Sequence, residues 1–376
     1  MSDTTIDRVE SWYVRVPLAT PIRLGDMVIA HRDFALLRIR TAGGLDGVVY
    51  SLSRGAPLDL VLTELIGPRI LGREALDTRG RREELARSVV NLGTVGLVGR
   101  AMSLVDIGLW DIVGQAASMP VWRLLGGTRT TAPVLLVAPY ALDGESDEAY
   151  AERLAVVAAR GYQTLKLYPM PDPAAMGRRL AAIRSRLGPQ IRLVIDMAWS
   201  FRTARDAIAA VRSWTPYDLT WVEDPFPAEE WANIKALADA VDTPIAVGDE
   251  VSVRGTTERL ITERAVDVLR LDATSIGGFA AFDSLRDQAA LAGLTVSPHA
   301  YGEVHQHCVF AWPGTGPIEL FAPDSPTWGT GRFLARQLDA IEGTGEMHAP
   351  TEPGLGIDID WAAVEALAMR HTVATR

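Results

Sequence analysis

Short apolar runs alternate with amphipathic helical segments between about residues 130 and 330 of this 376-residue sequence. Eight such runs follow one another at intervals of roughly 23 to 31 residues, which is the spacing of parallel βα units. They lie near residues 135, 166, 194, 221, 246, 269, 296 and 319. This repetition leaves two architectures, a (β/α)8 barrel or an open doubly wound sheet. No G-x-G-x-x-G motif follows the first strand, so the barrel is favoured.

Three consecutive predicted strands end in a carboxylate. "RLVID" ends in Asp196, "LTWVE" ends in Glu223, and "IAVGDE" ends in Asp249 and Glu250. The C-terminal ends of barrel strands form the catalytic face. Carboxylates that converge there would repel one another unless a cation neutralises them. Because hard divalent ions prefer all-oxygen sites, the pattern predicts that Asp196, Glu223 and one of the next two acids bind Mg²⁺.

Other strand ends carry groups that can transfer protons. "TLKLYP" places Lys166 and Tyr168 two residues apart, and hence on the same face of a strand. "LRLDA" ends in Asp272, and "VSPHAY" places His299 at the end of the next strand. There the acid can orient the imidazole and raise its basicity. With Glu319 on the eighth strand, these residues predict a two-sided proton-transfer site that faces the metal.

The rest of the chain predicts a second domain and a cytoplasmic protein. Residues 1–128 show strand patterns and then helical periodicity, so an α+β domain precedes the barrel of residues 129–345. A net charge of −10 and a pI near 5.2 argue against nucleic acid or an anionic membrane as a partner. The polar N-terminus is not a signal peptide, and no apolar run is long enough to span a membrane. The single cysteine, Cys308, is expected in the core and fits a reducing compartment.

In order and spacing, these motifs resemble those of the mandelate racemase/muconate lactonising branch of the enolase superfamily. The resemblance covers nearly the whole length, from "RAMSLVDIGLWDIVGQAASMPVWRLLGG" through "WVEDP" and "IAVGDE" to "SPHAYGEVHQH" and "EPGLGIDID". It implies an α+β capping domain over a modified (β/α)8 barrel. The C-terminal segment, residues 346–376, is expected to return to the capping domain. It also implies one Mg²⁺, a small-molecule carboxylate as substrate, and a homo-oligomer. In such enzymes the ion stabilises the enediolate that forms when a base removes the proton α to the carboxylate.

The resemblance assigns the metal site residue by residue. Asp196, Glu223 and Asp249 fall on the three ligand positions of the family. Glu250 follows Asp249 directly; alternation lets only one of them point inward, and the family match favours Asp249. The family's D-x-N after the third strand is D-M-A here, so Ala198 supplies no side-chain amide near the metal.

The resemblance also assigns the proton-transfer groups. Asp272 and His299 fall on the Asp–His dyad of the racemase subgroup, and Glu319 matches a residue that hydrogen-bonds a substrate carboxylate oxygen. Lys166 matches the first lysine of the family's K-x-K motif, but Tyr168 replaces the second lysine, which is a base. The identity of a second base therefore stays open.

Two reactions fit these groups. Dehydration of an acid sugar to a 2-keto-3-deoxy acid needs one strong base and an acid for the leaving hydroxyl. Racemisation or epimerisation needs two bases, and Tyr168, with an ordinary pKa of about 10, matches neutral pH less well than His299, near 6.5. Lys166 and Mg²⁺ would lower the pKa of Tyr168. We therefore favour a dehydratase with His299 as the abstracting base, and keep a racemase or epimerase as the alternative.

A third hypothesis follows from the altered K-x-K motif. The protein could be a relative that binds a metal and a carboxylate without turnover. The retained Asp272, His299 and Glu319 argue against it, and exchange of the α proton in D₂O separates the two classes.

Two segments of the first domain are expected to form loops over the barrel mouth that select the substrate. Residues 18–33 contain Arg23, and residues 50–56 contain Arg54. We predict that these arginines bind the substrate together with Lys166 and Glu319. The same segments also contain Asp26, His31, Arg32 and Ser53. This composition suits a hydroxylated, anionic ligand better than an aryl one.

Overall fold

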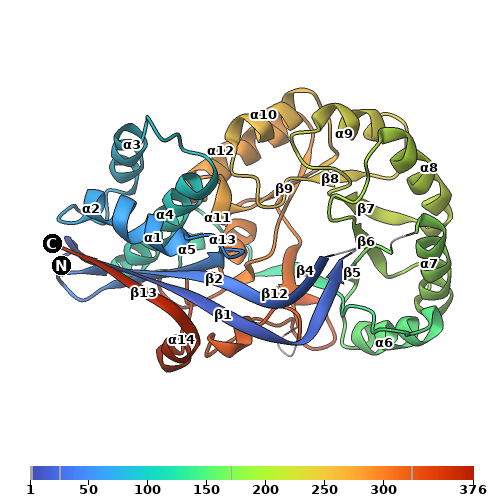
Figure 1. Cartoon of the computed structure of the whole chain (residues 1–376), viewed down its shortest axis with the longest axis horizontal. Helices are drawn as coiled ribbons and strands as arrows, with labels where there is room; N and C mark the ends of the chain where they lie inside the picture. The colour runs from blue at the N-terminus through green and yellow to red at the C-terminus, as the bar shows by residue number, and fades with distance from the viewer. Residues whose placement is uncertain (1–2, 25–26, 171, 323–324) are drawn as a thin grey trace.

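The computed structural model covers the whole chain and describes residues 3–24, 27–170, 172–322 and 325–376. It contains an antiparallel sheet, formed by both ends of the chain, and a parallel sheet, formed by the middle. Figure 1 shows the antiparallel sheet with its helices on the left and the barrel on the right. The predicted fold class, a modified (β/α)8 barrel with an N-terminal α+β domain, is confirmed.

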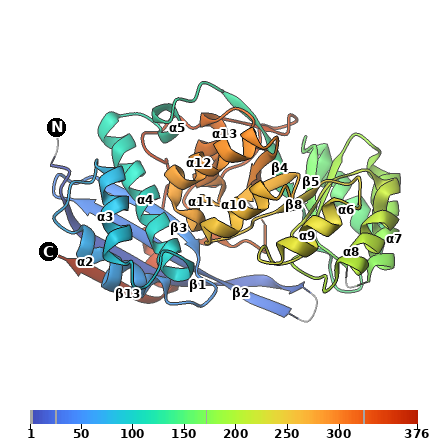
Figure 2. The same cartoon turned by 90° about the horizontal axis from the view of Figure 1, so that it is seen from above.

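The antiparallel sheet has the strand order β13-β1-β2-β3. Its strands are β1 (Ile6–Leu24), β2 (Met27–Thr41), β3 (Asp46–Leu52) and β13 (Ala368–Thr375). Gly44 turns the chain between β2 and β3 at a φ of 86°, a conformation that glycine adopts without strain. Helices pack against this sheet (Figure 2), as the helical periodicity of the segment predicts. Those that contact the sheet are α1 (Leu58–Leu60), the π-helix η1 (Val61–Ile66), α2 (Gly67–Ile70) and α4 (Gly96–Ala117). The other two helices of this segment, α3 (Thr78–Ser88) and α5 (Val121–Leu124), pack on α4.

All eight predicted barrel strands are present and parallel. They are β4 (Thr131–Val137), β5 (Thr164–Leu167), β6 (Arg192–Asp196), β7 (Leu219–Glu223), β8 (Ile245–Val247), β9 (Val268–Leu271), β10 (Thr295–Pro298) and β11 (Ile318–Phe321). Their order is β10-β9-β8-β7-β6-β5-β4-β11. Between β10 and β11 the barrel is joined by an isolated bridge, Val296 to Thr315, so it is nearly closed.

Helices connect consecutive barrel strands and lie on the outside of the barrel (Figure 1). They are α6 (Asp147–Ala159), α7 (Pro173–Leu187), α8 (Ala204–Trp214) with η2 (Thr215–Tyr217), α9 (Trp231–Ala238), α10 (Arg254–Thr262), α11 (Ala273–Ile276) with α12 (Gly278–Leu291), and α13 (Gly302–Ala311). Ser146, Asp172 and Thr203 cap three of these helices by accepting backbone N–H groups.

The barrel departs from the regular pattern after its eighth strand. Among the described residues that follow β11, a 3-10 turn, η3 (Thr330–Arg332), stands where an eighth helix would come. The next strand, β12 (Glu346–His348), pairs antiparallel with β4. No helix in the described part of the chain combines the length and hydropathy that a bilayer crossing requires.

The last residues of the chain form a strand that the sequence pattern did not reveal. From the sequence, residues 346–376 were expected to return to the cap, but no strand was assigned to them. Helix α14 (Trp361–Leu367) is present, but β13 follows it at once and pairs antiparallel with β1. The side chains of β13 alternate between half-buried and exposed, so no buried apolar stripe marks the strand in the sequence.

Residues 18–24 and 27–33 form a β-ribbon where loops were expected. Strands β1 and β2 remain paired beyond an irregularity at Pro17, as far as the pair Leu24–Met27. The ribbon reaches from the sheet to the barrel (Figure 1). Asp26 lies outside the described residues. Hydrogen bonds along the ribbon therefore hold the cap residues in place.

Candidate active site

The three predicted ligand carboxylates meet at the C-terminal ends of adjacent strands. Asp196 ends β6, Glu223 ends β7, and Asp249 follows β8 by two residues. One carboxylate oxygen of each lies within 4.8 Å of those of the other two. Val194 and Trp221, two residues before Asp196 and Glu223, belong to the buried side-chain layer inside the barrel. Strand alternation thus directs the acids inward above that layer.

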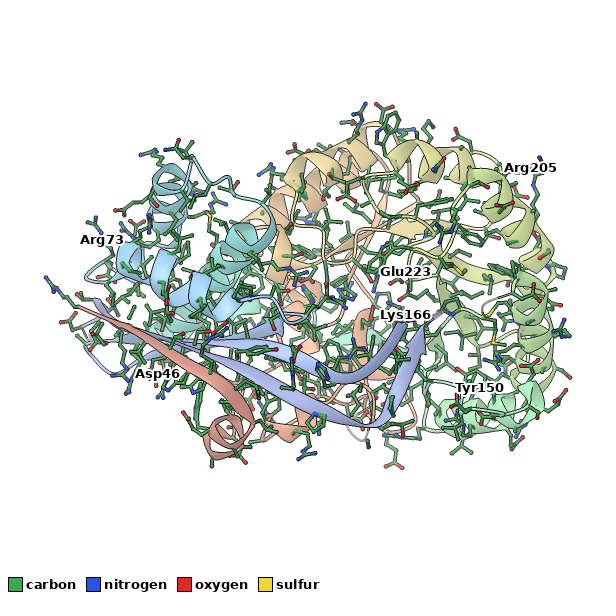
Figure 3. All side chains as sticks on the ribbon, in the orientation of Figure 1. Asp46, Arg73, Tyr150, Lys166, Arg205 and Glu223 are labelled. Atoms are coloured by element: carbon green, nitrogen blue, oxygen red, sulfur yellow. The ribbon has the colours of Figure 1, made fainter. Side chains whose placement is uncertain are left out.

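Lys166 lies among these carboxylates as a buried cation. Its Nζ is 2.5 Å from Glu223 Oε1 and 3.2 Å from Asp196 Oδ2. It is also 3.8 Å from Asp249 Oδ2 and 3.3 Å from Glu319 Oε1. Figure 3 shows the Lys166 and Glu223 side chains close together near the centre of the barrel. Burial disfavours the ammonium, but the carboxylates outweigh it and raise the pKa of Lys166 well above its usual value.

Arg270 on β9 is a second buried cation, and it was not predicted. Its Nη2 donates to Glu319 and its Nη1 donates to Ser297 Oγ at 2.6 Å. Its Nε lies 3.3 Å from Glu223 Oε1 and 3.6 Å from Asp249 Oδ1. Arg270 therefore holds Glu319 as a carboxylate and also faces two of the predicted metal ligands.

The sequence contained a signal for Arg270. Arg270 lies two residues after Val268, whose side chain belongs to the inner layer of the barrel, and two residues before Asp272. The alternation that pairs Lys166 with Tyr168 therefore applies to Arg270 as well.

The charges of this cluster fit one divalent cation. The four carboxylates and two cations leave two negative charges in a buried region. Burial raises the pKa of Asp196 and of Asp249, whereas Arg270 and Lys166 outweigh burial and lower the pKa of Glu223. Asp249 Oδ1 is buried and accepts no hydrogen bond from a described residue. An oxygen-only donor set with an unsatisfied oxygen suits a hard ion such as Mg²⁺.

Glu250 points away from this cluster. Its φ of 52° turns the chain directly after Asp249. Its carboxylate accepts hydrogen bonds from Arg54 at 2.8 and 3.0 Å and from Arg100 at 2.8 Å. Although Glu250 is buried, these two arginines hold its pKa well below the usual range. Asp249 therefore contacts the barrel cluster, whereas its neighbour Glu250 contacts residues of the cap.

His299 and Asp272 form the predicted pair on the other side of the carboxylates. His299 Nδ1 is 3.4 Å from Asp272 Oδ2, and its Nε2 is 3.3 Å from Asp249 Oδ2. Asp272 Oδ1 also accepts hydrogen bonds from the backbone N–H and the hydroxyl of Thr274. Burial opposes ionisation of Asp272, but the hydrogen bond from His299 and the charge of His305 lower its pKa overall. An ionised Asp272 orients the imidazole and leaves Nε2 available for proton transfer.

Tyr168 lies beside Tyr140, which sequence reasoning did not identify. The two rings are stacked with their centroids 3.7 Å apart. Burial and Tyr140 raise the pKa of Tyr168 well above its usual value, and the opposing effect of Lys166 is smaller. Burial and Tyr140 thus outweigh the lowering of the Tyr168 pKa that was expected from Lys166.

Cap and barrel residues line one pocket, which encloses about 700 Å³ of free space including its open mouth. The cap contributes Ile29, Arg32, Leu52 and Arg54. The predicted site residues in its wall are Lys166, Tyr168, Asp196, Asp249, His299 and Glu319. The site therefore lies between the first domain and the barrel.

The structure places the remaining residues noted in the sequence as follows. Arg23 belongs to β1, but its side chain lies outside the described residues. His31 is directed to Asp33, at 3.5 Å, and is not part of the pocket wall. Ala198 lines the pocket and donates its backbone N–H to Asp196 Oδ1 at 2.9 Å. Cys308 is buried in α13, as expected.

Two protein-family models match the chain. The model described as "Enolase C-terminal domain-like" matches residues 149–363. The model described as "Mandelate racemase / muconate lactonizing enzyme, N-terminal domain" matches residues 8–126. The first covers most of the barrel, and the second covers the α+β domain.

Individual relatives agree with this assignment. The L-talarate/galactarate dehydratase of Salmonella typhimurium is 29% identical over 355 residues, which cover 92% of this chain and 86% of the relative. The 3,6-anhydro-alpha-L-galactonate cycloisomerase of Streptomyces coelicolor is 27% identical, covering 97% of this chain and 99% of the relative. Among solved structures, L-talarate dehydratase from Polaromonas sp. JS666, complexed with Mg and L-glucarate, is 26% identical and superimposes with a TM-score of 0.88 over 99% of both chains. This chain therefore belongs to the mandelate racemase/muconate lactonizing enzyme branch of the enolase superfamily.

Proposed function

We propose that the protein catalyses Mg²⁺-dependent dehydration of an acid sugar to a 2-keto-3-deoxy acid. One observation carries the proposal: a neutral phenol, Tyr168, and an Asp-supported imidazole, His299, line the same pocket as the carboxylates that fit a divalent ion. Dehydration needs one base and one acid, and these two groups supply them. The dehydratase names of two relatives support this reaction.

Asp196, Glu223 and Asp249 would hold the ion. When bound, Mg²⁺ supplies positive charge that stabilises the negative charge developing on the substrate carboxylate. Lys166, which lies between Glu223 and Glu319, would bind that carboxylate beside the ion. Arg270 keeps Glu319 ionised, so its carboxylate can only accept hydrogen bonds. We propose that Glu319 holds Lys166 in place for the substrate and accepts a hydrogen bond from the substrate.

The proton transfers are assigned to the two groups as follows. His299 Nε2 takes the proton from the carbon α to the carboxylate, and Asp272 stabilises the resulting imidazolium. The β carbon–oxygen bond then breaks, and the hydroxyl leaves as water with a proton donated from the Tyr168 side of the pocket. The enol that remains tautomerises to the 2-keto acid, so the products are the 2-keto-3-deoxy acid and water.

A racemase or epimerase is the second candidate. Groups on two sides of the carboxylate site favour it, and the cycloisomerase relative is an isomerase by name. It requires Tyr168 to act as a base, which the raised pKa of this phenol opposes. A metal- and carboxylate-binding protein without turnover is the third candidate, and the complete set of acid, base and ligand residues argues against it.

One experiment separates the three candidates. The protein is incubated with Mg²⁺ and a set of acid sugars in D₂O, and the mixtures are examined by ¹H NMR and by assay for 2-keto acids. A dehydratase gives a 2-keto-3-deoxy acid, and an epimerase gives a deuterated stereoisomer. Binding of acid sugars without any exchange would contradict both enzyme proposals.

Further features remain proposals from the sequence. We propose that residues 1–128 act as the cap, that residues 129–345 carry the chemistry, and that residues 346–376 tie the two together. The pairing of β13 with β1 supports this last part. Cytoplasmic localisation and homo-oligomer formation are also predictions, and sedimentation measures the second directly.

A further inference from the structure

Arg32 is a buried cation in the pocket that no carboxylate of the described residues neutralises. It lies on β2 where the ribbon meets the barrel mouth, and it is 8% exposed. Its Nε donates to the carbonyl oxygen of Thr327 at 3.2 Å, and its guanidinium carbon lies 5.8 Å from the ring centroid of Trp328. Within the described ranges, Nη1 and Nη2 of Arg32 form no hydrogen bond, and they are the ends of a side chain that lines the pocket.

The other cap arginines near the pocket are compensated. Arg54 forms two hydrogen bonds to Glu250, and Arg100 forms a third. Burial of a charge is costly unless a counter-charge and hydrogen bonds accompany it. The structure provides both for Arg54 and Arg100, but for Arg32 the described residues provide one backbone carbonyl. A bound anion would complete the environment of Arg32.

The inner end of the pocket does not supply this anion. The carboxylates there are balanced by Lys166, Arg270 and the divalent ion that they fit. The reacting carboxylate of the substrate is expected at that end, beside the ion. Arg32 belongs to the cap side of the same pocket, near Tyr140, whose raised pKa it partly opposes. The pocket therefore has one cationic position at each end.

We propose that Arg32 binds a second carboxylate of the substrate, so that the preferred acid sugars are aldarates, with a carboxylate at both ends. This inference rests on the proposed function and specifies its substrate class. A guanidinium suits the role because its two Nη groups can donate to both oxygens of one carboxylate. Thr327 and Trp328 hold the rest of the side chain, so little of its conformational freedom remains to be lost on binding.

The test compares aldarates with the matching aldonates, which carry a terminal hydroxymethyl group. In the presence of Mg²⁺, kcat/KM of the wild type should favour the aldarates by about 10²-fold, the scale of a charge-assisted bidentate contact. Arg32→Gln should remove most of that preference by lowering kcat/KM for aldarates far more than kcat/KM for aldonates. Arg32→Lys keeps the positive charge but loses the two parallel N–H donors of the guanidinium. Its preference for aldarates should therefore lie between that of the wild type and that of Arg32→Gln.

A second measurement does not depend on turnover. Adipate and hexanoate have six carbons each and no hydroxyl groups, so neither reacts, and they differ by one carboxylate. In titration calorimetry with Mg²⁺, the wild type should bind adipate more tightly, and Arg32→Gln should abolish the difference. Arg40→Gln is the matched control, because Arg40 lies on the same strand and its partner is Asp46. It should retain the preference for dicarboxylates.

The outcomes separate this inference from the proposed function. If aldonates are turned over as well as aldarates, or if Arg32→Gln lowers both classes equally, the inference is wrong and the dehydratase assignment stands. If no acid sugar exchanges its α proton, the proposed function is wrong. The adipate comparison on the wild type then still decides whether the pocket selects dianions.

Discussion

At the scale of single residues, the neighbours Asp249 and Glu250 have separate tasks. Asp249 faces the carboxylate cluster with an unsatisfied oxygen, while Glu250 binds two cap arginines. Asp249→Asn removes a charged ligand, so we expect the affinity for Mg²⁺ to fall by more than about 10²-fold in titration calorimetry. A loss of that size exceeds the usual effect of replacing a residue that only hydrogen-bonds to a ligand. Glu250→Gln should alter Mg²⁺ affinity only slightly. The reverse order would show that Glu250 is the ligand.

Tyr168 and His299 differ in the protons that they can move. His299→Asn keeps a polar group of similar size but cannot transfer a proton, so turnover and α-proton exchange should both fall by about 10²-fold or more. Tyr168→Phe removes only a hydroxyl group. If the phenol is the acid for the leaving hydroxyl, this variant should still exchange the α proton in D₂O while product forms slowly. Loss of exchange in Tyr168→Phe, with exchange retained in His299→Asn, would invert the two roles.

At the scale of elements, buried acids of helix α4 connect the first domain to the barrel and to the C-terminal segment. Asp106 Oδ2 accepts the backbone N–H of Phe279 at the start of α12, at 2.9 Å. Asp111 accepts the N–H groups of Val48 and Leu355. Burial raises the pKa of Asp106 to about 7 and that of Asp111 to about 6. Both carboxyls therefore retain protons at pH values where the unfolded chain has released them.

This difference predicts the pH dependence of stability. From about pH 4 to pH 7 these two carboxyls bind more protons in the folded chain than in the unfolded chain, so they make the free energy of unfolding fall as the pH rises. A tenfold difference in proton affinity between the folded and unfolded chain corresponds to about 1.4 kcal/mol. Asp106→Asn cannot ionise, so its stability relative to the wild type should increase across this window in urea denaturation. Asp287→Asn, an exposed position on α12, is the control and should show no such change.

The elements of the barrel could be predicted from the sequence because each is a local pattern. Four or five apolar residues followed by a dozen with helical periodicity identify a βα unit without knowledge of its neighbours. Strand β13 was missed because its partner β1 lies at the other end of the chain and its faces are only half-buried. The ribbon of residues 18–33 was missed for a related reason: its strands stabilise each other by pairing, beyond the buried part of the sheet.

The same limit applies to the site. The acids at strand ends could be predicted from position and alternation, and the structure brings them together. Tyr140 and the contacts of Glu250 depend on side chains from distant segments, so the sequence alone carried no signal for them. Strand alternation directs Arg270 into the barrel, as it does Lys166. A basic residue within an apolar strand nevertheless contradicts the strand pattern until its carboxylate partners are known.

At the scale of the whole molecule, the metal site and the cap are connected through consecutive residues. Asp249 belongs to the carboxylate cluster, and Glu250 binds Arg54 beyond β3 and Arg100 on α4. The ends of the chain meet in one sheet through β1 and β13, which ties the C-terminal segment to the cap. A change at the cluster is therefore expected to affect the stability of both domains.

The last prediction concerns this connection and the surplus charge at the barrel mouth. Mg²⁺ binds the folded chain, in which the three carboxylates converge, and has no comparable site in the unfolded chain. At a free concentration of about 100 times its dissociation constant it should therefore add about 2.7 kcal/mol to the free energy of unfolding. In differential scanning calorimetry, the wild type should show a higher Tm with Mg²⁺ than with a chelator, through a single shifted transition if cap and barrel unfold together. Asp249→Asn relieves part of the repulsion and weakens the site, so its Tm should respond much less to Mg²⁺.

An equal response in both proteins would mean that the stabilising ion binds elsewhere. A shift confined to one of two transitions would mean that the Glu250 contacts do not couple the domains.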